Sequence, residues 1–177
     1  MEILEQSSAK QFCRPDTLAA LRLLAQRFHQ IARQLRNRHD QRTTIEVEDE
    51  YDVQDLLHAL LRFTFDDIRP EERTPSYAGK STTMDFLLKT EQLVIETKKT
   101  RKGLGAKELG DQLIIDIQSY QAHPDCKTLF CFVYDPEGRI ANPIGIETDL
   151  SKLHDGLDVI VQLNLSPNRA HNKSGIA

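Results

Sequence analysis

The segment from residue 84 to residue 99 contains the pattern that most restricts how this chain can fold. Two apolar, β-like runs, MDFLL and LVIETKK, flank the polar tetrapeptide KTEQ, and this order predicts an antiparallel hairpin. With the turn centred between Thr90 and Glu91, Asp85 lies directly opposite Glu96. Directly opposed side chains are roughly 4.5–5.5 Å apart at Cβ, so the two carboxylates repel each other unless a cation lies between them.

Lys98 follows Glu96 by two residues and therefore points to the same face of the strand. Two carboxylates and one ammonium group are thus expected to converge. This set suits the metal-assisted hydrolysis of a phosphodiester, because Mg²⁺ prefers carboxylate oxygens and a nearby lysine can orient or deprotonate the attacking water.

The alternative interpretation is a solvated strand face with an ordinary cross-strand ion pair. Two neighbours argue against it. Leu87 shares the face of Asp85, and Val94 shares the face of Glu96, so neither face is simply polar. Charges in strands that are apolar on both faces are costly unless they are paired or bound to a metal.

Asp85, Glu96 and Lys98 together form a D-(x)10-E-x-K pattern, which resembles the motif of the PD-(D/E)XK nuclease superfamily. Met84 stands where that motif usually has proline. The strings DEYDVQDLLHALL and IETKKTRKGLG are similar to the MboI/DpnII-like restriction endonuclease domain that recurs in bacterial anti-phage proteins. The resemblance implies an α/β fold, with a restriction-endonuclease-like core whose mixed central β-sheet of about five strands is flanked by helices, plus N-terminal helices.

The same resemblance implies an endonuclease that hydrolyses DNA with Mg²⁺, for which Mn²⁺ can substitute. Asp85, Glu96 and the carbonyl of Thr97 would hold the metal, and Lys98 would position or activate water. The chain departs from similar sequences at Thr83, where they tend to carry arginine. If that arginine binds the scissile phosphate, the missing charge weakens the clamp on the transition state.

A helix is expected from about Ala106 to Gln121, followed by a strand at 127–134, which is the order of the superfamily core. On this helix Gln112, Asp116 and Tyr120 recur every four residues and share one stripe. By resemblance, Gln112 assists catalysis and Tyr120 contacts the nucleic acid. The competing interpretation of Gln112 is a surface amide with ordinary local hydrogen bonds.

The acid-rich string from residue 48 to residue 61 predicts a helix with an apolar face. In the resembling nucleases the first core helix often contributes a glutamate to the metal site, and here Glu50 is that candidate. Gln54 lies one turn further on and could reach the same cluster. For Asp49 and Asp52 we expect only a favourable interaction with the helix dipole.

The formal net charge is −4, so binding to nucleic acid requires a local basic patch. The candidates beside the proposed site are Lys99, Arg101, Lys102 and Lys107. A second group, formed by Arg33, Arg36, Arg38 and Arg42, fits the solvated face and cationic end of a helix equally well.

Apolar residues between Pro15 and Leu35 follow a three-four repeat, which predicts a helix that docks on the core of its own chain. A homodimer through this helix, or association with another defence subunit, is the alternative. The expected division is a helical extension at 1–47, a nuclease core at 48–165 and a flexible tail at 166–177. No apolar run approaches the roughly 20 residues of a membrane span, and the start lacks a secretory signal, so the expected location is cytoplasmic.

The sequence thus predicts a Mg²⁺-dependent endodeoxyribonuclease, acting as an effector in anti-phage or restriction defence. Glu96→Ala and Lys98→Ala should each abolish cleavage. Because of Thr83, a catalytically idle module that binds nucleic acid or a partner protein stays open as an alternative. RNA as the substrate is a third hypothesis.

Overall fold

A computed structural model describes residues 9–73, 83–121 and 123–165, and side chains from residue 16 onward. Its elements, in chain order, are α1 (Ala9–Arg36), the 3-10 helix η1 (His39–Gln41), α2 (Glu50–Leu61), β1 (Ile68–Pro70), β2 (Phe86–Leu88), β3 (Leu93–Lys99), α3 (Ala106–Tyr120), β4 (Thr128–Asp135), α4 (Pro143–Leu150), β5 (Leu153–His154) and β6 (Leu157–Leu165). The predicted α/β class is confirmed.

The strands form one mixed sheet of six strands in the order β1-β2-β3-β4-β6-β5. β2 pairs antiparallel with both β1 and β3, whereas β3, β4 and β6 run parallel, and β5 pairs antiparallel with β6 at the far edge. About five strands were expected and six are present, of which the short strands β1 and β5 lie at the two edges. Strands of two or three residues carry too little periodicity to be recognised in a sequence.

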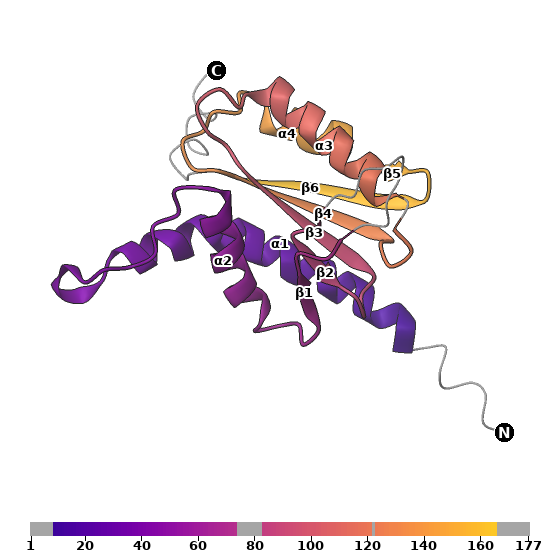
Figure 1. Ribbon diagram of the computed structural model, residues 1–177, viewed down its shortest axis with the longest axis horizontal. Coiled ribbons are helices and arrows are strands. Elements are labelled where there is room, and N and C mark those ends of the chain that lie inside the picture. The colour runs from indigo at the N-terminus through magenta and orange to yellow at the C-terminus, as the bar shows by residue number, and fades with distance from the viewer. Residues whose placement is uncertain (1–8, 74–82, 122, 166–177) are drawn as a thin grey trace, which may run out of the picture.

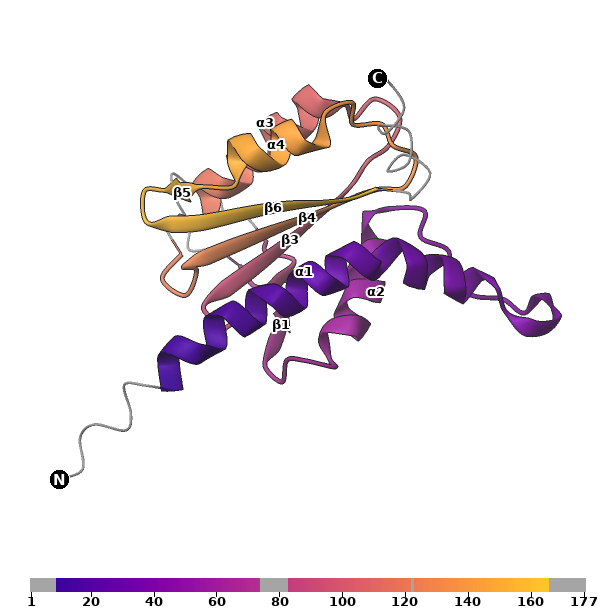
Figure 2. The same ribbon diagram turned by 180° about the vertical axis from the view of Figure 1, so that it is seen from behind.

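Helices cover both faces of the sheet. α1 and α2 lie on one face and α3 and α4 on the other, as both views show (Figure 1, Figure 2). Because both faces are covered, β3 and β4 are buried along their whole length, which explains their nearly continuous apolar sequences.

The core beneath α1 and α2 is centred on Phe28, which is fully buried. Its ring meets those of Phe132 and Tyr134 edge to face, with both centroids at 5.0 Å. The apolar stripe of α1 therefore docks on the sheet of its own chain, as expected. The helix also begins earlier than Pro15, at Ala9.

The second core fills the space between the sheet and the α3–α4 layer. Its members include Leu87, Val94, Leu109 and Leu113. Thus the hairpin strands contribute alternate side chains to the two cores, and a charged residue on β3 faces either one layer of helices or the other. The site described below owes its burial to this arrangement.

The expected tail at 166–177 falls outside the described residues. α1 and α2, which lie on either side of the predicted boundary at residue 47, pack in the same hydrophobic cluster, and the division into an extension and a core stays a prediction. Among the described residues, none of the helices has the length and hydropathy needed to cross a bilayer. Cys126 and Cys131 are buried free thiols.

Candidate active site

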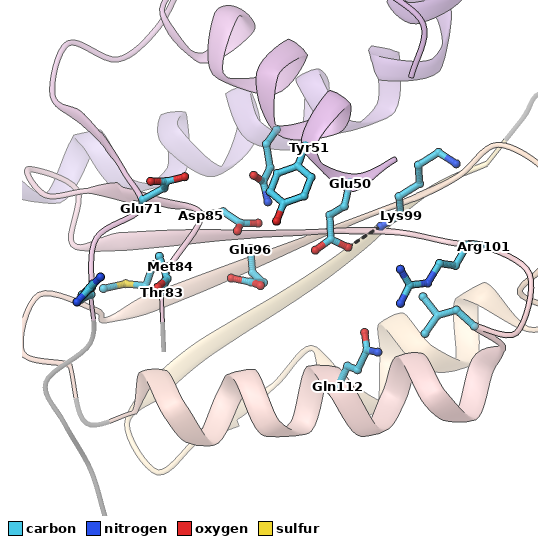
Figure 3. Close-up of a pocket in the computed structure, with 13 residues that line it drawn as sticks. Glu50, Tyr51, Glu71, Thr83, Met84, Asp85, Glu96, Lys99, Arg101 and Gln112 are labelled. Carbon is cyan, nitrogen blue, oxygen red and sulfur yellow. Dashed lines mark hydrogen bonds between the residues drawn. The ribbon is translucent and has the colours of Figure 1, made fainter. Parts of the chain in front are cut away.

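The hairpin between β2 and β3 places the predicted acids side by side. Phe86 pairs with Ile95, and Leu88 pairs with Leu93, which is the register expected from the sequence. Extended by one residue, this register puts Asp85 opposite Glu96. The two carboxylates face the same space between the sheet and the helices (Figure 3).

Asp85 is fixed by donors from the neighbouring strand and from α2. Its Oδ2 accepts hydrogen bonds from the Thr97 amide at 2.7 Å and from the Thr97 hydroxyl at 2.6 Å. Gln54 also donates to this carboxylate. Burial nevertheless raises the pKa of Asp85, against the opposing effect of these donors. Thr97 was predicted as a metal ligand through its carbonyl, and the structure shows its amide and hydroxyl holding Asp85 in place.

Glu96 is the most deeply buried acid of the site, with 5% of its surface exposed. Its two oxygens are held separately. Oε1 accepts from Lys98 Nζ at 2.5 Å, and Oε2 accepts from the Tyr120 hydroxyl at 2.6 Å. Burial and the neighbouring Asp85 raise the pKa of Glu96 to about 8, and the ammonium group of Lys98 opposes this shift without cancelling it.

Lys98 lies between two carboxylates. Its Nζ is 2.5 Å from Glu96 Oε1 and 3.1 Å from Asp116 Oδ2 on α3. Although burial acts to lower it, the pKa of Lys98 is raised, because Glu96 and Asp116 stabilise the ammonium form. The lysine therefore carries a positive charge at all physiological pH values and is not available as a proton acceptor.

Glu50 enters the site from the first turn of α2. A capping box fixes that helix end, in which Asp49 and Asp52 each accept from the other's backbone amide. This local role is consistent with the interpretation of these two acids as helix-end residues. Glu50 Oε2 accepts from the Lys99 amide at 3.3 Å. Burial raises the pKa of Glu50, with a further contribution from Asp85.

A cleft of about 790 Å³ opens over these acids. Asp85 and Glu96 line it from the sheet, Glu50 lines it from α2, and Gln112 reaches it from α3 (Figure 3). The structure thus brings the predicted Gln112 into the same cleft as the acids. It also adds lining residues that the sequence did not suggest, which are Tyr51, Glu71, Arg73 and Leu104.

The predicted basic residues separate into two groups. Arg101, Lys102 and Lys107 are exposed, and Arg101 lines the cleft. Lys99 also lines it, but its side chain is largely buried and its Nζ lies 3.9 Å from Glu137 Oε1. Lys99 is therefore partly neutralised within the protein.

Tyr120 occupies a different place from the one predicted. It was expected to contact nucleic acid, but none of its surface is exposed. A fully buried ring does not reach a DNA backbone, so we correct this expectation: Tyr120 is a hydrogen-bond partner of Glu96. The four-residue spacing of Gln112, Asp116 and Tyr120 correctly predicted that they lie on one side of the helix. It did not predict how deeply each side chain is buried.

The donor set suits a hard divalent cation. Asp85, Glu96 and Glu50 offer carboxylate oxygens in one cleft, and burial raises the pKa of all three, with a further contribution from Asp85 to the shifts of Glu50 and Glu96. Among the described residues, no three His, Cys, Asp or Glu side chains lie close enough together to hold a metal ion. Mg²⁺ commonly takes only one or two protein carboxylates and completes its shell with water and phosphate, so Asp85 and Glu96 fit this requirement.

Residues 19–165 match the family model REase_DpnII-MboI, a restriction endonuclease family of the PD-(D/E)XK type. The chain belongs to this family. No curated protein and no solved structure matches the chain. In the REase_DpnII-MboI family the match spans α2, the hairpin and α3, so the elements that build the cleft all lie within the restriction endonuclease domain. The family supports a nuclease function.

Proposed function

We propose that this chain is a Mg²⁺-dependent endonuclease that cleaves DNA, and that it serves as an effector in prokaryotic restriction or anti-phage defence, in the cytoplasm. The observation that carries the proposal is the convergence of Asp85, Glu96 and Lys98 beside a cleft large enough for a nucleic-acid backbone. The family supplies the general class of reaction, and the donor chemistry of these residues supports the metal.

In this proposal Asp85 and Glu96 hold the cation, assisted by Glu50. When bound, it would supply Lewis acidity to a phosphoryl oxygen and would stabilise the negative charge that develops there. Thr97 and Gln54 orient Asp85, and Tyr120 orients Glu96. Lys98 remains an ammonium and positions the attacking water, since its raised pKa prevents it from acting as a base. Gln112, from α3, contacts the water or the phosphate.

The decisive experiment compares the wild type with Glu96→Gln. This substitution keeps the shape of the side chain and removes its charge. Incubation with plasmid DNA and Mg²⁺ should yield nicked or linear product only for the wild type, a loss of about 100-fold or more for the variant. Asp149→Asn, an exposed carboxylate on α4, is the matched control and should cut normally. Equal cutting by Glu96→Gln would refute the assignment.

Substrate class is tested in the same assay. Matched DNA and RNA oligonucleotides, each single-stranded and duplex, should be cleaved at different rates, and the proposal expects preference for DNA. Sequencing the ends of the DNA products would then reveal any site preference. Preferential cleavage of RNA would reject DNA as the substrate but would retain the metal-dependent mechanism.

A second candidate is a catalytically idle module that binds nucleic acid or another defence subunit. One observation favours it: both oxygens of Glu96 already accept hydrogen bonds, from Lys98 and Tyr120, which a metal would have to displace in part. A calorimetric titration with Mg²⁺ or Mn²⁺ distinguishes the two candidate functions. Retained DNA binding without metal binding would support the idle module.

A further inference from the structure

Among the described residues that line the cleft, the cations are Arg73, Lys99 and Arg101. Lys99 is buried and faces Glu137, and Lys98, just beneath the cleft, is held by Glu96 and Asp116. Arg73 and Arg101 are exposed. These two arginines are therefore the described cleft cations that solvent, and hence a polyanion, can reach.

Arg73 is brought to the cleft by an extension of the sheet beyond β1. Two backbone hydrogen bonds continue the pairing: the Glu71 amide donates to the Asp85 carbonyl at 3.1 Å, and the Met84 amide donates to the Glu72 carbonyl at 2.8 Å. An isolated antiparallel bridge then pairs Arg73 with Thr83. Directly opposed residues of an antiparallel pair project to the same face, so Arg73 emerges beside Thr83, two residues from Asp85.

Arg101 lies at the end of the cleft that is opposite to Thr83. It follows β3, and its guanidinium points into the cleft opposite Gln112, whereas Thr83 lies beyond Asp85 and Glu96 at the far end (Figure 3). The carboxylates are thus placed between two exposed arginine positions. A guanidinium binds phosphate oxygens through paired donors, which makes arginine well suited to hold a phosphodiester.

We propose that Arg73 and Arg101 bind successive backbone phosphates on either side of the scissile one, so that a nucleic-acid strand crosses the cleft from Arg101, over Asp85 and Glu96, to Arg73. This inference rests on the proposed function and deepens it. It assigns Arg73 the positive charge that the sequence lacks at Thr83, since the two residues face each other across the bridge. Arg73 is a binding residue that neither the motif nor the basic cluster of the sequence indicated.

The test measures DNA binding by the full chain without cleavage. Fluorescence anisotropy with a labelled duplex, in the Glu96→Gln background and without divalent cation, is compared with and without Arg73→Ala. Loss of one phosphate contact should weaken binding about tenfold and lower the slope of log K against log salt by roughly 0.9 for a duplex, or roughly 0.7 for a single strand. Lys152→Ala, which removes an exposed cation at the α4–β5 end, is the matched control and should leave both quantities unchanged.

A variant in which the positive charge is moved from residue 73 to residue 83 tests where the phosphate binds. The double variant Arg73→Ala/Thr83→Arg moves the positive charge to the opposing residue of the bridge. This variant should regain most of the DNA affinity that Arg73→Ala loses. A double variant that binds as weakly as Arg73→Ala would overturn the proposed position. An Arg73→Ala protein with unchanged affinity and salt slope, or with the same loss as Lys152→Ala, would overturn the inference itself.

Failure of this inference is distinguishable from failure of the proposed function. Cleavage by the otherwise wild-type protein is measured in parallel with Mg²⁺. If that protein cuts DNA and the Arg73→Ala variant cuts with the same kcat/KM, the strand path is wrong and the nuclease assignment stands. If the otherwise wild-type protein neither binds nor cuts nucleic acid, the proposed function fails, and the strand path fails with it.

Discussion

The Tyr120 hydroxyl donates a hydrogen bond of 2.6 Å to Oε2 of Glu96, and both residues are buried between the sheet and α3. This contact joins the helix to the strand that carries the proposed metal ligands. Because Lys98 occupies the other oxygen, Glu96 has one orientation only. Orientation of a ligand by a second layer of hydrogen bonds commonly affects metal affinity by roughly 10- to 100-fold.

Tyr120→Phe should therefore weaken Mg²⁺ binding by about tenfold. The substitution leaves one oxygen of a buried carboxylate without its donor, which should also lower the free energy of unfolding by roughly 1–3 kcal/mol. Calorimetry with Mg²⁺ and urea denaturation measure the two effects. Tyr134→Phe is the control, since its hydroxyl contacts His29 Nδ1 at 3.0 Å beneath α1. An equal loss of Mg²⁺ affinity in both variants would contradict the prediction.

The raised pKa of Glu96 also predicts how the stability of the fold changes with pH. Its folded pKa is raised from 4.5 to about 8, so the folded state holds this proton more tightly than the unfolded state does. The contribution of Glu96 is fully present below about pH 4.5 and is lost as the pH rises towards about 8. Without metal, the stability of the wild type minus that of Glu96→Gln should fall across this range, by at most about 1.4 kcal/mol per pH unit.

Saturating Mg²⁺ should flatten that slope, because a cation replaces the proton as the partner of the carboxylate. Mg²⁺ affinity should accordingly increase with pH up to about 8, where Glu96 loses its proton. Urea denaturation at several pH values, with EDTA or with Mg²⁺, measures both trends. A stability difference that rises with pH in EDTA would have the wrong sign and would contradict the raised pKa.

The sequence predicted the parts of the site that depend on local periodicity. The hairpin register follows from a polar tetrapeptide between two apolar runs, and it correctly placed Asp85 opposite Glu96. The four-residue spacing on α3 correctly placed Gln112, Asp116 and Tyr120 on one side of that helix. Periodicity gives direction, however, and not depth, which is why Tyr120 was expected at the surface.

Arg73 shows what local patterns do not contain. It follows a strand of three residues and pairs with Thr83 through a single bridge, so its position depends on the tertiary pairing of a short edge segment. Asp116 is similar: its place on the helix stripe was visible, but its contact with Lys98 depends on how closely α3 packs on β3. The charge state of the site depends on that packing, so local sequence patterns did not predict it.

Asp116→Asn tests this packing. Asp116 contributes to the raised pKa values of both Glu96 and Lys98, through repulsion of the carboxylate and attraction of the ammonium. Its neutralisation should lower both pKa values, so the pH window in which metal-free stability declines should move to lower pH. Denaturation at a series of pH values detects the shift. Asp111→Asn, an exposed acid on the same helix, should produce none, and an unshifted window in Asp116→Asn would count against the proposed coupling.

Asp135 should control the position of the basic loop that leaves β3. It is fully buried at the end of β4, where Oδ1 accepts from the Thr100 hydroxyl at 2.7 Å and from the Arg139 amide at 2.8 Å, and Oδ2 accepts from the Ile140 amide at 2.9 Å. Asp135→Ala removes all three contacts, so the free energy of unfolding should fall by roughly 3–5 kcal/mol. Thr100→Val removes only one contact and should lower the free energy of unfolding by about 1–2 kcal/mol.

Because Arg101 follows Thr100 directly, DNA affinity should decline in both variants under conditions where they remain folded. Stability measured by urea denaturation and affinity measured by anisotropy test this order, and an Asp135→Ala protein as stable as Thr100→Val would contradict it.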